Sequence, residues 1–188
     1  MSNTIGDDDH HGHGHGNGHG HAHGQDGQCS HMELSSTSQS LDELEFERGV
    51  WGAVVNNNVD KLRSLLNGNA ALSNAVDRTG YYPLHYAARH NDTKCLGLLL
   101  DSGARVNVIT DGGATPLHRA AFCGGINNCK LLLERDGRVL DQQDADGMTA
   151  LHKAYSQNNL DVIEYLIQRG ADTNIKDRRG KIPSEYKP

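Results

Sequence analysis

The sequence lacks the long hydrophobic run that a membrane-spanning helix requires. No stretch of the 188-residue chain approaches the roughly 20 consecutive apolar residues that cross a bilayer. The first residues also lack the basic segment followed by an apolar segment that marks a secretory signal peptide. Cysteine is scarce, with four residues in the whole chain and no close pairs. This scarcity argues against a disulfide scaffold, and we expect a reducing compartment, namely the cytoplasm, the nucleus or both.

Residue sets that carry catalysis are missing too. The chain shows no nucleophile with a base and an orienting group, and no glycine-rich loop that would hold phosphate. We therefore expect neither enzymatic activity nor a cofactor.

Positive charge is absent from the first part of the chain. Residues 1–45 contain eight of the 24 acidic residues and none of the 18 lysines and arginines. This segment carries −8 and residues 46–188 carry +2, against the total of −6. A body of +2 lacks the dense basic patch of nucleic-acid-binding proteins, so we expect no nucleic-acid partner. One hypothesis is that the acidic segment competes with an acidic partner for a basic surface on the body.

Residues 1–39 are predicted to be a disordered, acidic tail, because histidine and glycine dominate it and few apolar residues could form a core. Clustered imidazoles on a flexible chain bind Zn²⁺, Cu²⁺ or Ni²⁺. The simpler interpretation is a low-complexity tail with incidental metal affinity, and a purification tag is a third possibility. The candidate metal ligands are His10, His11, His13, His15, His19, His21 and His23.

The most informative stretch is 115–121, where each residue suits the beginning of a helix. Thr115 is a favoured N-cap, because its hydroxyl can accept a hydrogen bond from a free backbone N–H. Pro116 suits the first helical position, where the missing N–H costs nothing. Leu117 begins an apolar face, and Ala120 and Ala121 are small enough for another helix to approach closely.

The stretch recurs around residues 83 and 149, so that histidines fall at positions 85, 118 and 152. The spacings of 33 and 34 residues are typical of a solenoid. A turn glycine precedes each copy, and an apolar stripe typical of a second helix follows it.

The period divides residues 40–188 into a cap, three full repeats and a partial unit. A capping box at 40–43 predicts the first helix of the cap. Trp51 stands where later repeats carry histidine, and we expect it to seal the end of the stack. The last unit has room for one helical turn. The expected boundaries are 40–76 for the cap, 77–109, 110–143 and 144–176 for the repeats, and 177–188 for the partial unit.

Residues 77–182 resemble ankyrin repeats, and the Thr-Pro-Leu-His motif of that family is complete at 115–118. Tyr82, Ala150 and Tyr155 depart from the family pattern. The resemblance implies an all-α solenoid of helix–turn–helix units with β-hairpin-like loops, about four repeats plus a truncated fifth. It also implies that the recurring histidines form hydrogen bonds across the turn. A shared metal ion is not expected, because stacked helices lie about 8–10 Å apart and three imidazoles would each need to approach to about 2.0–2.1 Å.

The resemblance further implies that loop tips and the ridge of first helices face a concave groove, where a partner protein would bind. Tyrosine, arginine and phenylalanine are enriched at interfaces. A surface that is basic by chance is the alternative interpretation. Tip candidates are Arg78, Thr79, Tyr81, Asp111, Ala114, Asp146, Met148, Arg178, Arg179 and Lys181. Ridge candidates are Tyr86, Arg89, His90, Arg119, Phe122, Cys123, Lys153 and Gln157, which include three cations and no acid.

The sequence therefore predicts a monomeric, non-enzymatic adaptor or scaffold that binds another protein through this groove, without a membrane. The alternative function is a metal-binding or metal-buffering protein that acts through the N-terminal histidines.

Overall fold

The computed structural model of the chain describes residues 46–186. The predicted capping box and the seven N-terminal histidines lie outside those residues. All described residues belong to one unit of the chain, which spans residues 31–188. Between residues 46 and 186 the regular elements are helices and no strand is present, as expected for an all-α solenoid. None of the described helices is long and apolar enough to cross a membrane.

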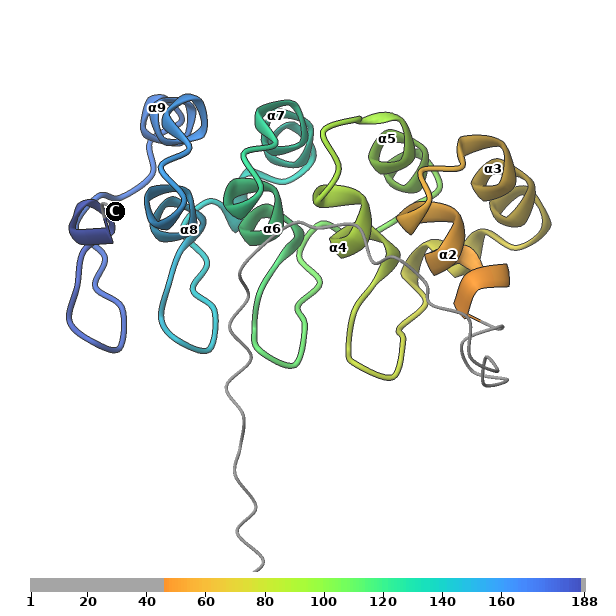
Figure 1. Cartoon of the computed structure of the whole chain (residues 1–188), viewed down its shortest axis with the longest axis horizontal. Coiled ribbons are helices and arrows are strands. Elements are labelled where there is room, and N and C mark those ends of the chain that lie inside the picture. Colours follow the sequence, from red (N-terminus) through yellow and green to blue (C-terminus); the bar gives the residue numbers. More distant parts are fainter. Residues whose placement is uncertain (1–45, 187–188) are drawn as a thin grey trace, which may run out of the picture. The chain divides into compact units, whose positions relative to one another are not determined.

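The helices come in pairs, and the second helix of each pair lies on the side away from the projecting loops (Figure 1). In the last three pairs such a loop leads into the first helix. A short helical stretch at 46–48 precedes them. The pairs are α2 (Val50–Val55) with α3 (Val59–Gly68), α4 (Pro83–Ala88) with α5 (Lys94–Asp101), α6 (Pro116–Phe122) with α7 (Ile126–Arg135), and α8 (Ala150–Ser156) with α9 (Leu160–Gln168). Three short 3-10 helices are η1 (Ala70–Asn74), η2 (Gly137–Val139) and η3 (Pro183–Tyr186).

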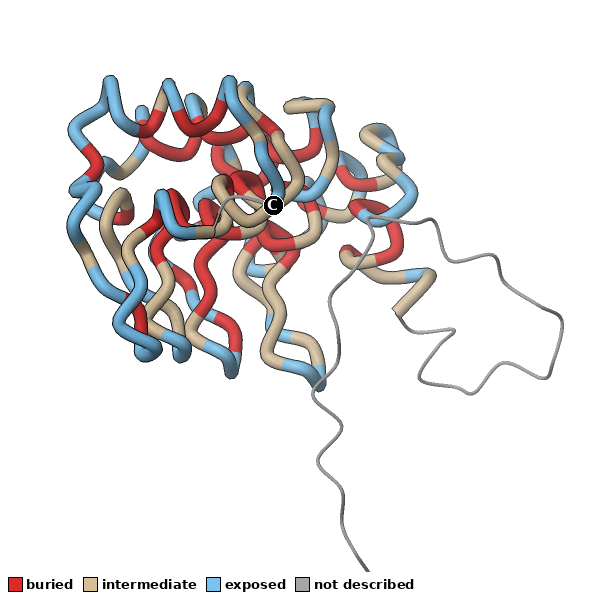
Figure 2. Tube along the Cα trace, turned by 60° about the vertical axis from the view of Figure 1, so that its left-hand side comes forward, coloured by how far each residue is buried: buried red, intermediate tan, exposed pale blue. Residues whose placement is uncertain are grey.

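Equivalent helices of successive repeats pack on one another. In the row of first helices, α4 contacts α2 and α6, and α8 contacts α6 and η3. In the second row, α3 contacts α5 and α7 contacts α9. The core lies within and between the two rows, and the loop ends are exposed (Figure 2). The recurring Leu84, Leu117 and Leu151 are at most 1% exposed.

The helix starts predicted at 115 and 149 are confirmed. The hydroxyls of Thr115 and Thr149 accept hydrogen bonds from the backbone N–H three residues on, at 3.4 and 3.5 Å. These are the N-cap bonds that satisfy an otherwise unpaired helical donor. Tyr82 takes the same place before α4 without a side-chain cap bond.

The recurring histidines link each repeat to the next, as predicted. Nδ1 of His118 accepts the N–H of Thr115 at 3.1 Å, so its Nε2 carries the proton and donates to the Met148 carbonyl at 2.9 Å. His85 and His152 use Nε2 in the same way on the carbonyls of Ala114, at 2.9 Å, and Lys181, at 3.2 Å. Each imidazole therefore bonds a separate carbonyl in the following loop.

Both ends of the described stack carry aromatic side chains. Trp51 is half-buried, packs against the core and stacks on Phe46 with ring centroids 6.0 Å apart. At the other end η3 forms the single helical turn expected for the partial unit. Its Pro183 is buried, and the Tyr186 ring meets the His152 ring edge-on at 5.8 Å.

Candidate functional site

Four loops, which we call fingers, project from the first helices at 77–81, 110–114, 144–148 and 177–181 (Figure 1). In the first finger the Asp77 carboxylate oxygen Oδ1 accepts the backbone N–H groups of Thr79 at 2.8 Å and Tyr81 at 2.9 Å. Asp144 and Asp177 bond their own fingers in the same pattern. A backbone bond from the first residue to the carbonyl of the fifth closes each finger, at 2.9–3.0 Å. The fingers are therefore held by internal hydrogen bonds.

Neighbouring fingers are also joined by their backbones, with one exception. The N–H of Ala145 donates to the Gly112 carbonyl, and the N–H of Arg178 donates to the Asp146 carbonyl, both at 2.9 Å. Among the described residues no equivalent backbone bond links finger 77–81 to finger 110–114. That pair is joined by side chains instead.

The first helices contribute one residue per repeat beside the fingers. These residues recur at intervals of 33 or 34 and are Tyr86, Arg119, Lys153 and Tyr186. We call the fingers together with these four residues the finger face.

Three of the four residues bond the aspartate of their own finger. The Tyr86 hydroxyl donates to Oδ2 of Asp77 at 2.6 Å, and the Tyr186 hydroxyl donates to Oδ2 of Asp177. Lys153 forms an ion pair with Oδ2 of Asp144 at 2.8 Å. Lys153 is one of the three ridge cations, and an aspartate outside the ridge, in its own repeat, balances its charge.

The fourth residue, Arg119, differs. Its finger begins with Thr110, so it has no aspartate to bond. Nη2 of Arg119 donates to the Tyr81 hydroxyl of the preceding finger, and the guanidinium carbon lies 5.0 Å from the centroid of that ring. Nε is buried without a hydrogen-bond partner. This contact is the side-chain link between the first two fingers.

Aromatic rings lead from the N-terminal end of the stack to Arg119. The Tyr81 and Tyr86 centroids are 5.5 Å apart, and Phe46 meets Tyr86 edge-on at 5.7 Å. With Trp51 stacked on Phe46, the row contains four rings, and each is half-buried rather than sealed in the core. Large amphipathic rings beside an arginine are the composition that dominates binding energy at protein interfaces.

Asp77 and Asp177 stay charged, and Tyr86 and Tyr186 stay neutral, at physiological pH. Burial alone would raise the pKa of Asp77, but the bonds from Tyr86 and from the finger backbone outweigh it and hold the pKa below its usual value. The Asp177 carboxyl is lowered in the same way. Burial and the neighbouring carboxylate raise the pKa of Tyr86 and bring that of Tyr186 to about 12. These groups serve as fixed hydrogen-bonding partners and not as proton donors for chemistry.

The remaining predicted residues fall into exposed and covered groups. The exposed fingertip residues are Arg78, Thr79, Asp111, Asp146, Arg178, Arg179 and Lys181. On the ridge, Arg89 and Gln157 are exposed, and His90, Phe122 and Cys123 are half-buried. Ala114 was expected at a tip and is instead 9% exposed, because it closes its finger against the His85 imidazole. Met148 is half-buried with its sulfur 3.4 Å from Lys153 Nζ.

Sequence reasoning missed two residues here, one in the aromatic row and one in the finger face. Phe46 lies ahead of the recognisable repeats, so the periodic pattern gave it no position on the ridge. Tyr186 lies 33 residues after Lys153, and extending the period into the partial unit would have identified it.

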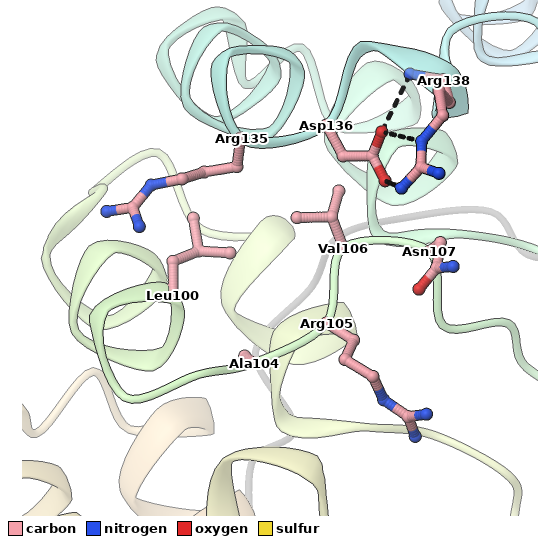
Figure 3. Close-up of a pocket in the computed structure, with 8 residues that line it drawn as sticks. All are labelled: Leu100, Ala104, Arg105, Val106, Asn107, Arg135, Asp136 and Arg138. Atoms are coloured by element: carbon pink, nitrogen blue, oxygen red, sulfur yellow. Dashed lines mark hydrogen bonds and ion pairs between the residues drawn. The ribbon is translucent and has the colours of Figure 1, made fainter.

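A cavity of about 320 Å³ lies on the other side of the repeats, where the loops after α5 and α7 meet (Figure 3). Arg138 closes a double hydrogen bond with Asp136, at 2.9 Å each, and Arg135 is paired with Asp101. Two of its three arginines are therefore neutralised locally. The lining residues are Leu100, Ala104, Arg105, Val106, Asn107, Arg135, Asp136 and Arg138, a set without a nucleophile.

Two of the three cysteines in the described region, and its three recurring histidines, are buried and suited to structure rather than chemistry. Cys95 and Cys129 are fully buried, and burial raises their thiol pKa to about 11 and about 12. Such thiols are poor nucleophiles. Within residues 46–186 no group of three or more metal-ligating side chains comes together.

Stacked helix pairs with projecting fingers define a helical repeat solenoid. The family model for ankyrin repeats matches residues 50–144 and 110–177, which together cover more than half of the chain. The chain therefore belongs to the ankyrin repeat family, whose repeats are generally protein–protein interaction modules and are typically non-enzymatic.

Several curated proteins share this region. Human ankyrin repeat domain-containing protein 39 is 37% identical over 78 residues, which cover 41% of this chain and 42% of the relative. Bovine SMC5-SMC6 complex localization factor protein 1 is 38% identical over 145 residues, covering 76% of this chain and 11% of the relative. Drosophila melanogaster transient receptor potential cation channel subfamily A member 1 is 35% identical over 111 residues, covering 57% and 9%. The chain thus matches less than half of each relative's length.

Proposed function

We propose that this protein is a non-enzymatic adaptor or scaffold that binds another protein through the finger face. The observation that carries the proposal is the row of half-buried rings, Phe46, Tyr86 and Tyr81, which leads to Arg119 beside the exposed fingertips. Family membership supports it, because ankyrin repeats serve generally as protein–protein interaction modules. The proposed adaptor is a monomer of the cytoplasm or nucleus and acts without a membrane or a nucleic acid.

Preorganisation explains how such a surface would bind. The loops of most proteins lose conformational freedom on binding, which opposes association. Here the finger backbones are already fixed by the bonds of Asp77, Asp144 and Asp177 to N–H groups. The exposed Arg178 and Arg179 can then vary in their contacts while the backbone beneath them keeps its position. The entropy cost of ordering the loops on binding would therefore be small, and more of the favourable contact energy of the aromatic rings would appear as affinity.

Site-specific photo-crosslinking in cells tests the location of the interface. The full chain would carry p-benzoylphenylalanine in place of Asp146 on a fingertip or, as the control, in place of Glu134, which is exposed on α7 in the other helical row. We expect a defined partner to be crosslinked from position 146 and not from position 134. Equal crosslinking from both positions would remove the finger face as the binding surface.

Affinity measurements on the purified partner then test the aromatic row. Tyr86→Ala should weaken binding at least tenfold, since truncating an interface tyrosine typically costs about 1–2 kcal/mol or more. Tyr165→Ala is the matched control, because Tyr165 is also half-buried but lies on α9. Thermal unfolding of both variants separates lost binding from lost folding.

The second candidate function, metal binding by the N-terminal histidines, is supported by seven imidazoles within 14 residues of sequence. Clustered histidines are a ligand set for Zn²⁺. Calorimetric titration of Zn²⁺ into the full chain and into a chain lacking residues 1–39 distinguishes the two functions. Micromolar or tighter affinity confined to the full chain would favour the metal function. Equal heats in both would leave the adaptor as the better account.

A further inference from the structure

Three of the four fingers begin with an aspartate, and the finger at 110–114 begins with a threonine. Their first residues are Asp77, Thr110, Asp144 and Asp177. In each aspartate, Oδ1 accepts backbone N–H groups of its own finger. Oδ2 bonds the finger-face residue of the helix that follows, which is Tyr86, Lys153 or Tyr186. Thr110 has a single side-chain oxygen, which accepts the Ala114 N–H at 3.2 Å. This finger therefore lacks the second carboxylate oxygen that the other three supply.

Arg119 is the residue that this missing oxygen leaves without a counter-ion. Lys153, at the same position of the next repeat, has Asp144 at 2.8 Å, whereas Arg119 forms no ion pair with any carboxylate in the described part of the chain. Its side chain is half-buried, and one of its donor nitrogens, Nε, has no partner. A partly desolvated charge without a counter-ion is unfavourable, so an external carboxylate would gain more here than beside a fully solvated arginine.

The contact with Tyr81 orders the guanidinium. The hydroxyl of Tyr81 accepts from Nη2 of Arg119, so it keeps its own proton for another acceptor. The ring beneath the guanidinium, 5.0 Å from its carbon, limits its rotation. Arginine and hydroxyl donors together suit one planar carboxylate, which arginine commonly binds through two hydrogen bonds.

We propose that Arg119 and Tyr81 bind the side-chain carboxylate of an acidic segment of the partner protein, in the role that Asp144 has for Lys153. This inference rests on the proposed function of the finger face, which it deepens by naming the charge of the partner. A carboxylate is favoured over other anions because the other three repeats place a carboxylate at the equivalent point. The Asp111 side chain, on the tip of the same finger, lies beside Gly80 of the preceding finger and forms no ion pair with Arg119.

The repeats themselves suggest the sharpest variant. Thr110→Asp gives this finger the residue that the other three have, so the new carboxylate should pair with Arg119 and occupy the site from within. Thr110→Asn is the matched control, because asparagine has the same shape and can hold the loop but carries no charge. Arg119→Gln removes the charge. Arg119→Lys keeps the charge but loses the planar guanidinium that can form two parallel hydrogen bonds to a carboxylate. Lys130→Gln removes an exposed cation on α7 and controls for net charge.

The probe is a fluorescein-labelled hexaglutamate peptide, acetylated and amidated, titrated with the full chain at low ionic strength, where exposed charges are least screened. We expect Thr110→Asp and Arg119→Gln to weaken binding at least tenfold, Arg119→Lys to weaken it less, and Thr110→Asn and Lys130→Gln to stay within twofold of the unmodified chain. Hexaglutamine should not bind. Thermal unfolding confirms that each variant is folded.

Two results would overturn the inference, namely no binding of hexaglutamate by the unmodified chain, or equal binding by the Thr110→Asp and Thr110→Asn variants. The outcome is separable from that of the proposed function. A partner that crosslinks to position 146 but is indifferent to Arg119→Gln would refute the carboxylate site and leave the adaptor in place. Failure of the crosslinking would refute the adaptor, whatever the peptide does.

Discussion

Each recurring histidine bonds both its own repeat and the next one along the stack. His118 accepts the N–H of Thr115 through Nδ1 and donates to the Met148 carbonyl through Nε2. A neutral imidazole has one acceptor and one donor, so both bonds require the neutral form. Burial lowers the pKa of His85 and of His118 to about 4, and the positive charge of Arg119 acts in the same direction. The links between repeats therefore depend on histidines that remain uncharged.

The first prediction concerns pH. The pKa of His85 and His118 is about 4 in the folded chain, against an ordinary value of 6.5, so the unfolded chain takes up protons first as the pH falls. The free energy of unfolding should therefore be highest above pH 6.5. It should decline between pH 6.5 and 4, by up to about 3 kcal/mol for each histidine. Urea unfolding across this range measures the decline.

A variant assigns the slope to one residue. His118→Gln should lower stability at pH 7 and reduce the number of protons taken up on unfolding by about one between pH 6 and 5. A slope equal to that of the unmodified chain would show that His118 does not contribute. Since other titrating groups are common to both proteins, the comparison isolates His118.

At the scale of the element, the finger is a loop whose geometry depends on glycine. Gly113 and Gly147 have φ values of 73° and 77°, a region that other residues rarely adopt. A Cβ on Gly113 would also lie 2.9 Å from the backbone nitrogen of Ala145 in the next finger. The glycine thus serves both the turn and the contact between fingers.

Two glycines separate these roles. Gly113→Ala should cost more than about 2 kcal/mol, because strain at positive φ adds to the clash with the Ala145 backbone. Gly103→Ala has the strain alone, since φ is 87° and nothing lies within 4 Å of its Cβ position, and should cost about 1 kcal/mol. Urea unfolding of both variants gives the difference. Equal losses of stability in the two variants would show that the neighbouring finger moves to accommodate the new Cβ at little cost.

Most helices and the histidine bonds between repeats were predictable from sequence, and the side-chain contact between the first two fingers was not. The local signals at Thr115 and Pro116 act within a few residues, so they identified the start of α6. Tyr81 and Arg119 lie 38 residues apart, and their contact depends on how two repeats stack.

The same limit applies to charge on the finger face. The sequence gives Lys153 and Arg119 the same repeat position and the same sign, so both were expected to be available to a partner. Only the neighbouring residue distinguishes them, Asp144 for Lys153 and Thr110 for Arg119. Charge that is available for binding is thus a property of pairs across the fold.

At the scale of the whole stack, each repeat contacts only its neighbours, so the stability of a repeat depends on what covers its two sides. The middle helix α6 is covered by α4 and α8, whereas α8 is covered on its far side by the short η3. In the last pair, Leu160 and Ile167 of α9 remain 66% and 42% exposed. The repeat at 144–176 should therefore open more readily than the repeats at 77–109 and 110–143.

This difference gives the last prediction. Tyr186→Ala removes the ring against His152 and the hydroxyl bond to Asp177, which weakens the cover that η3 provides. Amide hydrogen exchange should then be faster in α8 and α9, by about tenfold or more, and nearly unchanged in α4 and α5, because local opening in a linear stack begins at the least covered repeat. Ser184→Ala, an exposed neighbour in η3, is the control. If exchange instead rose equally in all four helices, the stack would open as one cooperative unit. A partner bound to the finger face would then stabilise the whole stack and not the last repeat alone.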